Sequence, residues 1–253
     1  MIFDIRLMSL YWNEHTWTDL QQKLPDVVLL PIGSVEAHGP HLPLSTDSII
    51  SETLAVLAAE ELQKKKIHAL ILPPIHYVVT DFSKDFPGTI SVSRESFQNL
   101  LCNIGDSLAA QGIHTLCIVN SHLEPNHIAA IHEFCRGCVS MKVLFPDKTK
   151  KPWASLLSNE FKQGACHAGS YETSLVLASR KELVREEHSK LPPNPVNLAT
   201  LMKQGVNSFR EAGAPQAYFG DPAAATREEG DRTFAILTRM IVETVLQHLR
   251  ACE

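Results

Sequence analysis

The chain has 253 residues, of which 44% are hydrophobic and 20% are charged, and its formal net charge at pH 7 is −5. This apolar content is sufficient for a buried core and excludes an intrinsically disordered chain. The longest basic run, Lys64-Lys65-Lys66, stands at the end of a predicted helix, where positive charge suits the helix dipole. Without a basic surface or a recognisable motif, a nucleic-acid-binding function is not expected.

The sequence also argues against a membrane protein, because no apolar run reaches the roughly 18 residues that a spanning helix needs. The first residues, Met1 to Arg6, contain an early acid and do not match a secretory signal. Cys135 and Cys138 form a lone C-x-x-C without the second pair that a zinc ribbon needs. Six cysteines without a disulfide or zinc-ribbon pattern fit a reducing compartment, so we expect a soluble cytoplasmic protein.

Strand-like and helix-like segments alternate along the chain. Apolar runs predict strands, and helical spacing with terminal signals predicts helices. In chain order, these are a strand at 26–32, a helix at 48–65, a strand at 68–72, a helix from 93 to 112, a strand at 115–119, a helix at 125–134, a strand at 143–145 and a helix at 224–249. The alternation indicates an α/β fold whose mostly parallel sheet is covered by helices. No long polar linker interrupts the chain, so residues 1–253 are assigned to a single domain.

A first cluster of polar side chains follows the first predicted strand. It holds two carboxylates and two imidazoles, namely Glu36, His38, His41 and Asp47. The alternative interpretation is that Thr46 and Asp47 cap the following helix and that the histidines lie on a surface loop. That alternative accounts for Thr46 but not for the two acids and two imidazoles together. Since α/β sheets place their sites after strands, the cluster predicts a functional site.

A second cluster, His122 and Glu124, follows the third predicted strand. A mixed imidazole and carboxylate pair at such a position can bind a metal ion. The alternative is that Asn120 or Ser121 simply caps the next helix. The residues alone leave both interpretations open.

A third cluster contains His167 and Glu172, which are candidates for proton transfer or for orienting other groups of a site. The alternative makes Ser170 a helix N-cap and Glu172 a favourable acid of the first helical turn. This alternative leaves His167 unexplained.

These clusters, in this order, resemble the creatininase family of metal-dependent amidohydrolases. The run 33–47 has the family's Gly-Ser-x-Glu-x-His-Gly motif continuing through His-Leu-Pro-Leu to Thr-Asp, and Phe-Pro-Gly-Thr stands at 86–89. The segment 120–124 is similar to the third motif, and His-Ala-Gly-x-x-Glu-Thr-Ser is intact at 167–174. With the similar closing segment Gly220-Asp221-Pro222, the resemblance covers most of the chain.

The resemblance implies a three-layer α/β/α domain that holds two divalent metal ions per chain, Zn²⁺ or Mn²⁺, with Fe²⁺ as a further option. It implies one ligand set of Glu36, Asp47 and His122. The second set would be His38, Asp47 and Glu124, so that Asp47 bridges the two ions. It also implies a homo-oligomer, such as a hexamer.

The resemblance further implies a reaction in which a metal-bridging hydroxide attacks a carbonyl carbon. His167 would donate a proton to the leaving nitrogen, and Glu172 would orient His167 or the water. A metal-binding protein without catalysis would have lost these two residues, and both are present.

The expected substrate is a small cyclic amide or amide-like molecule, cleaved at a non-peptide C–N bond. The alternatives within the family are a formamide-cleaving enzyme and a peptidase that trims a modified peptide. Glu124 follows His122 as in the creatinine hydrolases, which weighs against these alternatives. Phe82-Ser83 stands where many relatives have Glu-His, so part of the pocket differs from theirs.

Overall fold

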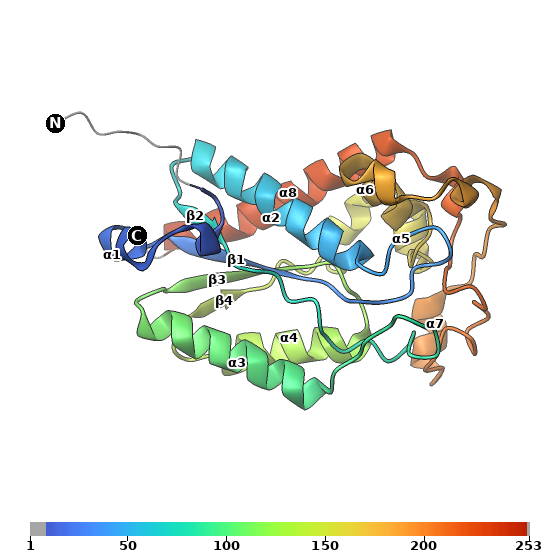
Figure 1. Ribbon diagram of the computed structural model, residues 1–253, viewed down its shortest axis with the longest axis horizontal. Helices are drawn as coiled ribbons and strands as arrows, with labels where there is room; N and C mark the ends of the chain where they lie inside the picture. Colours follow the sequence, from blue (N-terminus) through green and yellow to red (C-terminus); the bar gives the residue numbers. More distant parts are fainter. Residues whose placement is uncertain (1–8, 252–253) are drawn as a thin grey trace.

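The computed structural model describes residues 9–251, so the first residues, in which no secretory signal is expected, lie outside the described residues. The described chain forms a parallel four-stranded sheet with the strand order β2-β1-β3-β4 (Figure 1). Its strands are β1 (Val27–Ile32), β2 (Ala69–Ile71), β3 (Thr115–Asn120) and β4 (Lys142–Leu144). The predicted α/β fold with a mostly parallel sheet is confirmed.

Helices cover both faces of this sheet and give a three-layer arrangement (Figure 1). One face packs against α2 (Thr46–Lys64), α6 (Ser170–Ser179) and α8 (Arg227–Ala251), and the other against α3 (Arg94–Ala110) and α4 (Pro125–Gly137). The helices and strands expected from the sequence are all present, with ends that differ by at most three residues. Helix ends fray, so differences of this size are ordinary.

Several short helices were not predicted from the sequence. They are η1 (Trp12–Glu14), α1 (Trp17–Gln22), η2 (Trp153–Leu156), α5 (Asn159–Gln163), η3 (Lys181–Leu183), η4 (Glu186–Lys190), α7 (Leu198–Lys203) and η5 (Pro222–Ala224). Of these, α5 and α7 lie beyond the end of the sheet at which β1 and β3 finish (Figure 1). Within the described chain, none of the helices combines the length and the apolarity that crossing a membrane requires.

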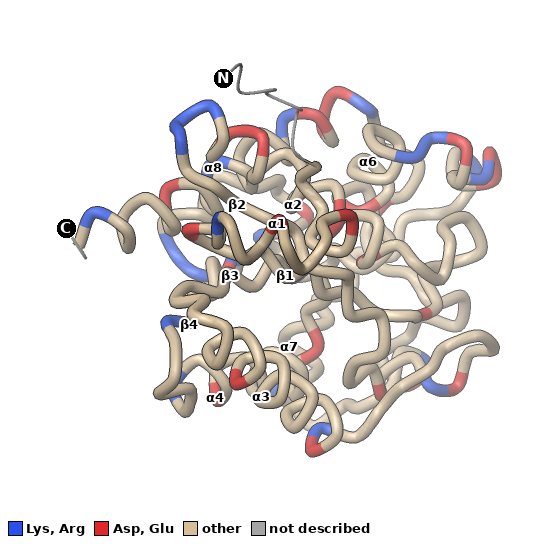
Figure 2. The backbone as a smooth tube through the Cα atoms, turned by 60° about the vertical axis from the view of Figure 1, so that its left-hand side comes forward, with Lys and Arg blue, Asp and Glu red and all other residues tan. Residues whose placement is uncertain are grey.

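The strands are apolar on both sides because helices cover both sides. In β1, Val28 and Leu30 face α3 and α4, whereas Val27 and Leu29 face α2 and α8. All six residues of β1 are buried, as expected for a parallel sheet between two helical layers. In Figure 2 the charged residues lie on helices and loops around the sheet, and β1, β2 and β3 carry none.

The connections of β1 leave a crevice at one edge of the sheet. The chain leaves β1 through α2 on one face and reaches β3, the other neighbour of β1, through α3 on the opposite face. In open α/β sheets, ligands bind at this kind of reversal, outside the carboxyl ends of the strands. The polar clusters that follow β1 and β3 therefore meet in the crevice.

Helix α6 is fixed in the structure by close contact with α8. A Cβ atom on Gly230 of α8 would overlap the backbone carbonyl of Ser174 in α6. Glycine is therefore required at this crossing, where two backbones approach each other directly.

We expect Gly230→Ala to lower the free energy of unfolding by roughly 1–3 kcal/mol, because the added methyl group forces two packed helices apart. Chemical denaturation measures the effect. The control is Gly137→Ala at the end of α4, where a Cβ would meet nothing within 4 Å. That variant should be unchanged or up to about 1 kcal/mol more stable, since alanine has the higher helix propensity. Equal stability of the two variants would contradict the proposed packing constraint.

Candidate metal centre

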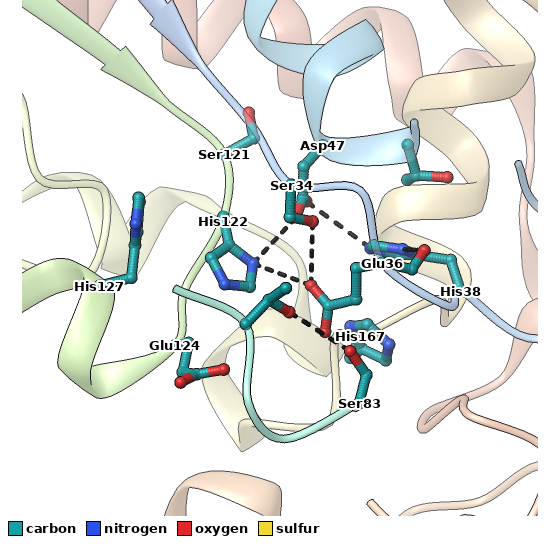
Figure 3. Close-up of polar contacts among 12 residues, drawn as sticks. Ser34, Glu36, His38, Asp47, Ser83, Ser121, His122, Glu124, His127 and His167 are labelled. Carbon is teal, nitrogen blue, oxygen red and sulfur yellow. Dashed lines mark hydrogen bonds and ion pairs between the residues drawn. The ribbon is translucent and has the colours of Figure 1, made fainter. Parts of the chain in front are cut away.

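Five of the predicted site residues converge at the carboxyl ends of β1 and β3, and Figure 3 labels four of them, Glu36, His38, Asp47 and His122. Two follow β1, one lies in the first turn of α2, one follows β3 and one lies in the first turn of α6: Glu36, His38, Asp47, His122 and Glu172. Each exposes at most 5% of its surface. Burying so many ionisable groups together is costly unless they are paired or bind a cation.

The first group consists of Glu36, Asp47 and His122, whose ligand atoms are close enough to hold one metal ion. His122 Nδ1 lies 3.0 Å from both Glu36 Oε2 and Asp47 Oδ2. The hydroxyl group of Ser34 lies 3.0 Å from Glu36 Oε2 and 2.8 Å from Asp47 Oδ2. His122 Nε2 donates to the carbonyl oxygen of Val79 at 2.9 Å. A histidine anchored in this way presents its other nitrogen to a metal ion.

The second group consists of His38, Asp47 and Glu172. His38 Nε2 lies 3.7 Å from Asp47 Oδ1 and 3.5 Å from Glu172 Oε2, while its Nδ1 donates to the carbonyl oxygen of Glu36 at 3.0 Å. His38 Nε2 and Asp47 Oδ1 are buried and have no hydrogen-bond partner among the described residues. Buried polar atoms are normally satisfied. These two atoms, facing each other beside a carboxylate, therefore fit a cation, and Asp47 is shared by both groups.

Glu124 belongs to neither group, and in Figure 3 its carboxylate lies apart from that of Glu36. Its Oε2 accepts a hydrogen bond from the backbone N–H of Phe82 at 3.2 Å, and its Oε1 is buried without a partner in the described chain. Burial raises the pKa of Glu124 to about 7. The geometry thus favours Glu172 over Glu124 as the third ligand of the second group, and the sequence-derived ligand role of Glu124 stays a prediction.

His167 lies beside the second group, and with Glu36 and His38 it forms a third set whose ligand atoms are close enough to hold an ion. Its ring centroid is 4.4 Å from that of His38 and 4.3 Å from that of Phe209. His167 Nε2 lies 3.0 Å from the carbonyl oxygen of Ala37, which can only accept, so this nitrogen carries the proton. Burial, together with the charge of His38, lowers the pKa of His167 to about 4. The ring is therefore neutral near pH 7, with Nδ1 available as a proton acceptor.

The electrostatics of the cluster favour positive charge. Burial acts to raise the pKa of Glu36, but His122, His167 and His38 outweigh it and lower this pKa to about 2. Burial acts to lower the pKa of His38, but Asp47, Glu172 and Glu36 outweigh it and raise this pKa to about 10. The carboxylates thus require cations close by, which protonated imidazoles or metal ions can supply.

A buried lysine that the sequence did not single out adds a further positive charge. The Lys148 ammonium group donates to the carbonyl oxygen of Ser121 at 3.2 Å and lies 5.9 Å from the centre of the Tyr171 ring. Burial lowers the pKa of Lys148, and Asp47 is the first of the acids that oppose this shift. In the sequence, Lys148 is one of several lysines in a polar run, and nothing there distinguishes it from its exposed neighbours.

The helix-capping interpretation of the first two clusters is wrong. The Thr46 hydroxyl group lies inside α2 and donates to the carbonyl oxygen of Pro43 at 2.7 Å. Asn120 donates through Nδ2 to the carbonyl oxygen of His122 at 2.6 Å and accepts from His127 Nε2 at 2.8 Å. Asn120 thus links the loop that presents His122 to the side chain of His127 in α4, while the N-cap position of α4 is Glu124.

The Phe-Pro-Gly-Thr motif holds the backbone of the first cluster through a hydrogen bond. The Thr89 hydroxyl oxygen accepts a hydrogen bond from the backbone N–H of Ala37 at 3.1 Å. Gly88 adopts a φ of 92°, a conformation that L side chains rarely adopt. The motif therefore fixes the backbone between Glu36 and His38.

A cavity of about 660 Å³ opens over the centre. Its floor contains the buried acids and His122, and Phe82 and Phe209 contribute apolar surface. Leu123, Cys166 and His167 line the cavity next to the centre. Its outer part comes from residues of the segment 149–155, of α5 and its end, and of α7 and its start, which together we call the outer wall.

Comparison with known proteins agrees with the motifs. The family model for creatininase, described as creatinine amidohydrolase, matches residues 13–245. The chain belongs to the creatininase family. It is a hydrolase of that family, as the sequence motifs predicted.

Individual family members differ in what they act on. The chain is 33% identical to the mycofactocin precursor peptide peptidase of Mycobacterium ulcerans (strain Agy99), over 86% of this chain and 85% of the relative. It is 27% identical to the creatinine amidohydrolase of Pseudomonas putida, over 94% and 96% of the two chains. A solved creatininase structure has the same fold, with a TM-score of 0.72 and 22% identity over 95% of this chain and 98% of that chain.

Helix α6, which carries a predicted site residue of this creatininase-family chain, is held by Glu160 of α5. The Glu160 carboxylate accepts backbone N–H groups of Ser170 at 3.0 Å, Tyr171 at 2.9 Å and Asp221 at 2.7 Å. A Cβ atom on Gly169 or Gly220 would overlap this carboxylate, which explains the glycines of the fourth motif and of the closing segment. Gly169, not Ser170, is the N-cap of α6, so that capping alternative is also wrong.

The other half of the alternative for the third cluster is correct, because Glu172 does lie in the first turn of α6. Its Oε2 accepts the backbone N–H of Ala168 at 2.7 Å, and the same atom faces His38. Burial raises the pKa of Glu172 to about 7. Its place near the helix start therefore does not exclude a role in the site.

We expect Glu160→Gln to lower the free energy of unfolding by about 1–3 kcal/mol, because the amide nitrogen cannot accept and leaves a backbone N–H without its acceptor. Thermal and chemical denaturation measure the loss. The matched control is Glu52→Gln on the exposed surface of α2, which should be within about 0.5 kcal/mol of the parent chain. Two variants of equal stability would show that Glu160 does not hold α6.

Proposed function

We propose that this chain is a metal-dependent amidohydrolase that binds two divalent cations and hydrolyses an amide C–N bond. The observation that carries the proposal is the pair of buried ligand groups that share Asp47. The unpartnered His38 Nε2 and Asp47 Oδ1 support the second cation in particular.

In this proposal, Glu36, Asp47 and His122 hold the first cation, and His38, Asp47 and Glu172 hold the second. Mixed nitrogen and oxygen ligands suit Zn²⁺, Mn²⁺ and Fe²⁺. Solved creatininases described as Mn and Zn–Zn forms support the first two of these ions. When bound, such cations make water a nucleophile near neutral pH and polarise a carbonyl oxygen.

His167 is the proposed group for proton transfer. Its Nε2 is anchored on Ala37, which fixes the ring and leaves Nδ1 for exchange. Because the ring is neutral, it can take the proton released by the attacking water and then deliver it to the leaving nitrogen. Amide nitrogen leaves poorly until it is protonated, so this transfer would assist the cleavage of the C–N bond.

Glu124 receives a different role from the one expected on sequence grounds. Its carboxylate lines the cavity, and its Oε1 is without a protein partner within the described chain. We propose that it contacts water or substrate in the cavity, while Glu172 completes the second ligand set. The two assignments are distinguished by the first experiment below.

The peptide alternative for the substrate is supported by two observations, and we propose it in place of the small cyclic amide. The cavity of about 660 Å³ lies within the range of roughly 300–1,000 Å³ typical of drug-sized ligand sites, so it has room for a ligand larger than a single small ring. A relative with 33% identity is a precursor peptide peptidase. The proposed substrate is therefore an amide bond within a peptide or peptide-like chain.

Metal content tests the ligand sets. The purified, metal-saturated chain should retain two divalent cations, and Glu172→Gln should lose one of them because it removes a ligand of the second group only. Asp47→Asn should weaken both, and Glu124→Gln should keep both. Elemental analysis after dialysis provides the measurement. One cation or fewer in the parent chain would refute the binuclear centre. If Glu124→Gln loses a cation and Glu172→Gln does not, Glu124 is the ligand, as the sequence predicted.

Turnover tests the reaction. We expect the metal-loaded protein to hydrolyse short peptides faster than creatinine, hydantoins, lactams or formamides. His167→Ala should lower kcat by roughly a hundred- to ten-thousand-fold, because general acid–base assistance is lost. Its metal content and melting temperature should be maintained. The control is His114→Ala, an exposed histidine just before β3, at the opposite end of that strand from the centre. If the protein cleaves only a cyclic amide, its substrate is the small ring and not a peptide.

A further inference from the structure

The cavity over the centre has its charges in two separate regions. The acids that line it are Glu36, Asp47, Glu124 and Glu172, and all four are buried at the floor. Apart from histidine, the basic residues that line it are Lys151, Lys162 and Lys203, and all three are exposed. Among the described residues, the outer wall contributes no acid to the lining. The floor therefore suits cations and the mouth suits anions.

The three lysines come from different parts of the outer wall. Lys151 precedes η2, Lys162 belongs to α5, and Lys203 is in the last turn of α7. The ammonium groups of these three lysines form no ion pair and no hydrogen bond with another residue of the described chain. The acid closest to Lys162 in sequence, Glu160, already accepts hydrogen bonds from three backbone N–H groups. Their ammonium groups are therefore free to meet a ligand.

Single exposed lysines are usually solvated surface residues, so convergence is the decisive point. Segments that are far apart in sequence bring three positive charges to one cavity mouth, beside the neutral side chains of Asn197 and Thr200. Like charges that gather without counter-charges raise the local concentration of an opposite charge and steer it inward. An anionic group on the substrate is the ligand that this arrangement fits.

We propose that Lys151, Lys162 and Lys203 form a subsite for a carboxylate, and that the substrate is a peptide whose free C-terminal carboxylate lies there while the scissile amide lies over the metal centre. This inference rests on the proposed function as a peptide-cleaving amidohydrolase. It adds that cleavage occurs close to the C-terminal end of the peptide, because the floor and the mouth belong to one cavity.

The expected size of the effect follows from the exposure of the lysines. An exposed ion pair changes affinity by a factor of about 1.5 to 5. Three lysines together should therefore contribute on the order of ten-fold or more at low ionic strength. The contribution should shrink with added salt, since exposed charges are screened.

The test is equilibrium binding to the metal-loaded full chain, in a His167→Ala background that suppresses turnover. The probes are N-terminally fluorescent hexapeptides with neutral side chains, made as the free acid and as the C-terminal amide, and anisotropy gives Kd. We expect the free acid to bind more tightly. The combined K151M, K162M and K203M variant should raise its Kd roughly ten-fold and that of the amide less than two-fold.

A control variant undergoes the same change in net charge, the loss of three lysines, but leaves the cavity lining intact. K142M, K181M and K190M remove three exposed lysines that do not line the cavity, and should leave the ratio of the two Kd values unchanged. A third probe, the amide form with an aspartate at its last position, distinguishes a side-chain carboxylate from the C-terminal one. Preference for this probe over the free acid would overturn the C-terminal assignment.

The remaining outcomes separate this inference from the proposed function. If the parent chain hydrolyses peptides but the lysine variant weakens both probes equally, or neither, the carboxylate subsite is refuted and the peptide function stands. If neither probe binds and only a cyclic amide is hydrolysed, both are refuted.

Discussion

The shared carboxylate of Asp47 is the interaction on which the centre depends. Its Oδ2 meets Ser34 and His122, and its Oδ1 faces His38, so one side chain belongs to both ligand groups. A buried carboxylate is costly, but here the N-terminal turn of α2 and the nearby imidazoles favour its charge. A Cβ atom on Gly33 would overlap the first turn of α2, so the loop after β1 can lie directly against it. The sheet and the helix thus position this carboxylate together.

The layers of the fold could be predicted because burial imposes a pattern on the sequence. The strands β1 and β3 are continuous apolar runs, and each is followed by polar residues that cannot belong to the core. Since the carboxyl ends of parallel neighbours meet at one edge, Glu36 and His122 had to lie close together once both strands were recognised. The family motifs added His167 and Glu172, which periodicity alone would not have linked to the strands.

Other parts of the centre depend on contacts that no local pattern records. Glu160 binds N–H groups of Ser170 and Asp221, which lie far from each other in sequence, and Lys148 is buried only because the chain folds it beneath Ser121 and Tyr171. The orientation of Glu124 depends on one backbone N–H of Phe82. Short helices such as α5 and α7 have too few residues to show a reliable hydrophobic periodicity, so the outer wall could not be predicted from the sequence.

The cavity is lined by two kinds of segment, which differ in how well they tolerate insertions and deletions during evolution. The floor belongs to strand ends and helix starts that the packed core holds in place, so an insertion there would displace ligands. The outer wall belongs to irregular segments and short helices outside the sheet, where changes in length are tolerated far better. New substrates can therefore be accommodated by rewriting these segments while the hydrolytic chemistry is inherited. Family members that act on creatinine and on a precursor peptide are what such an architecture permits.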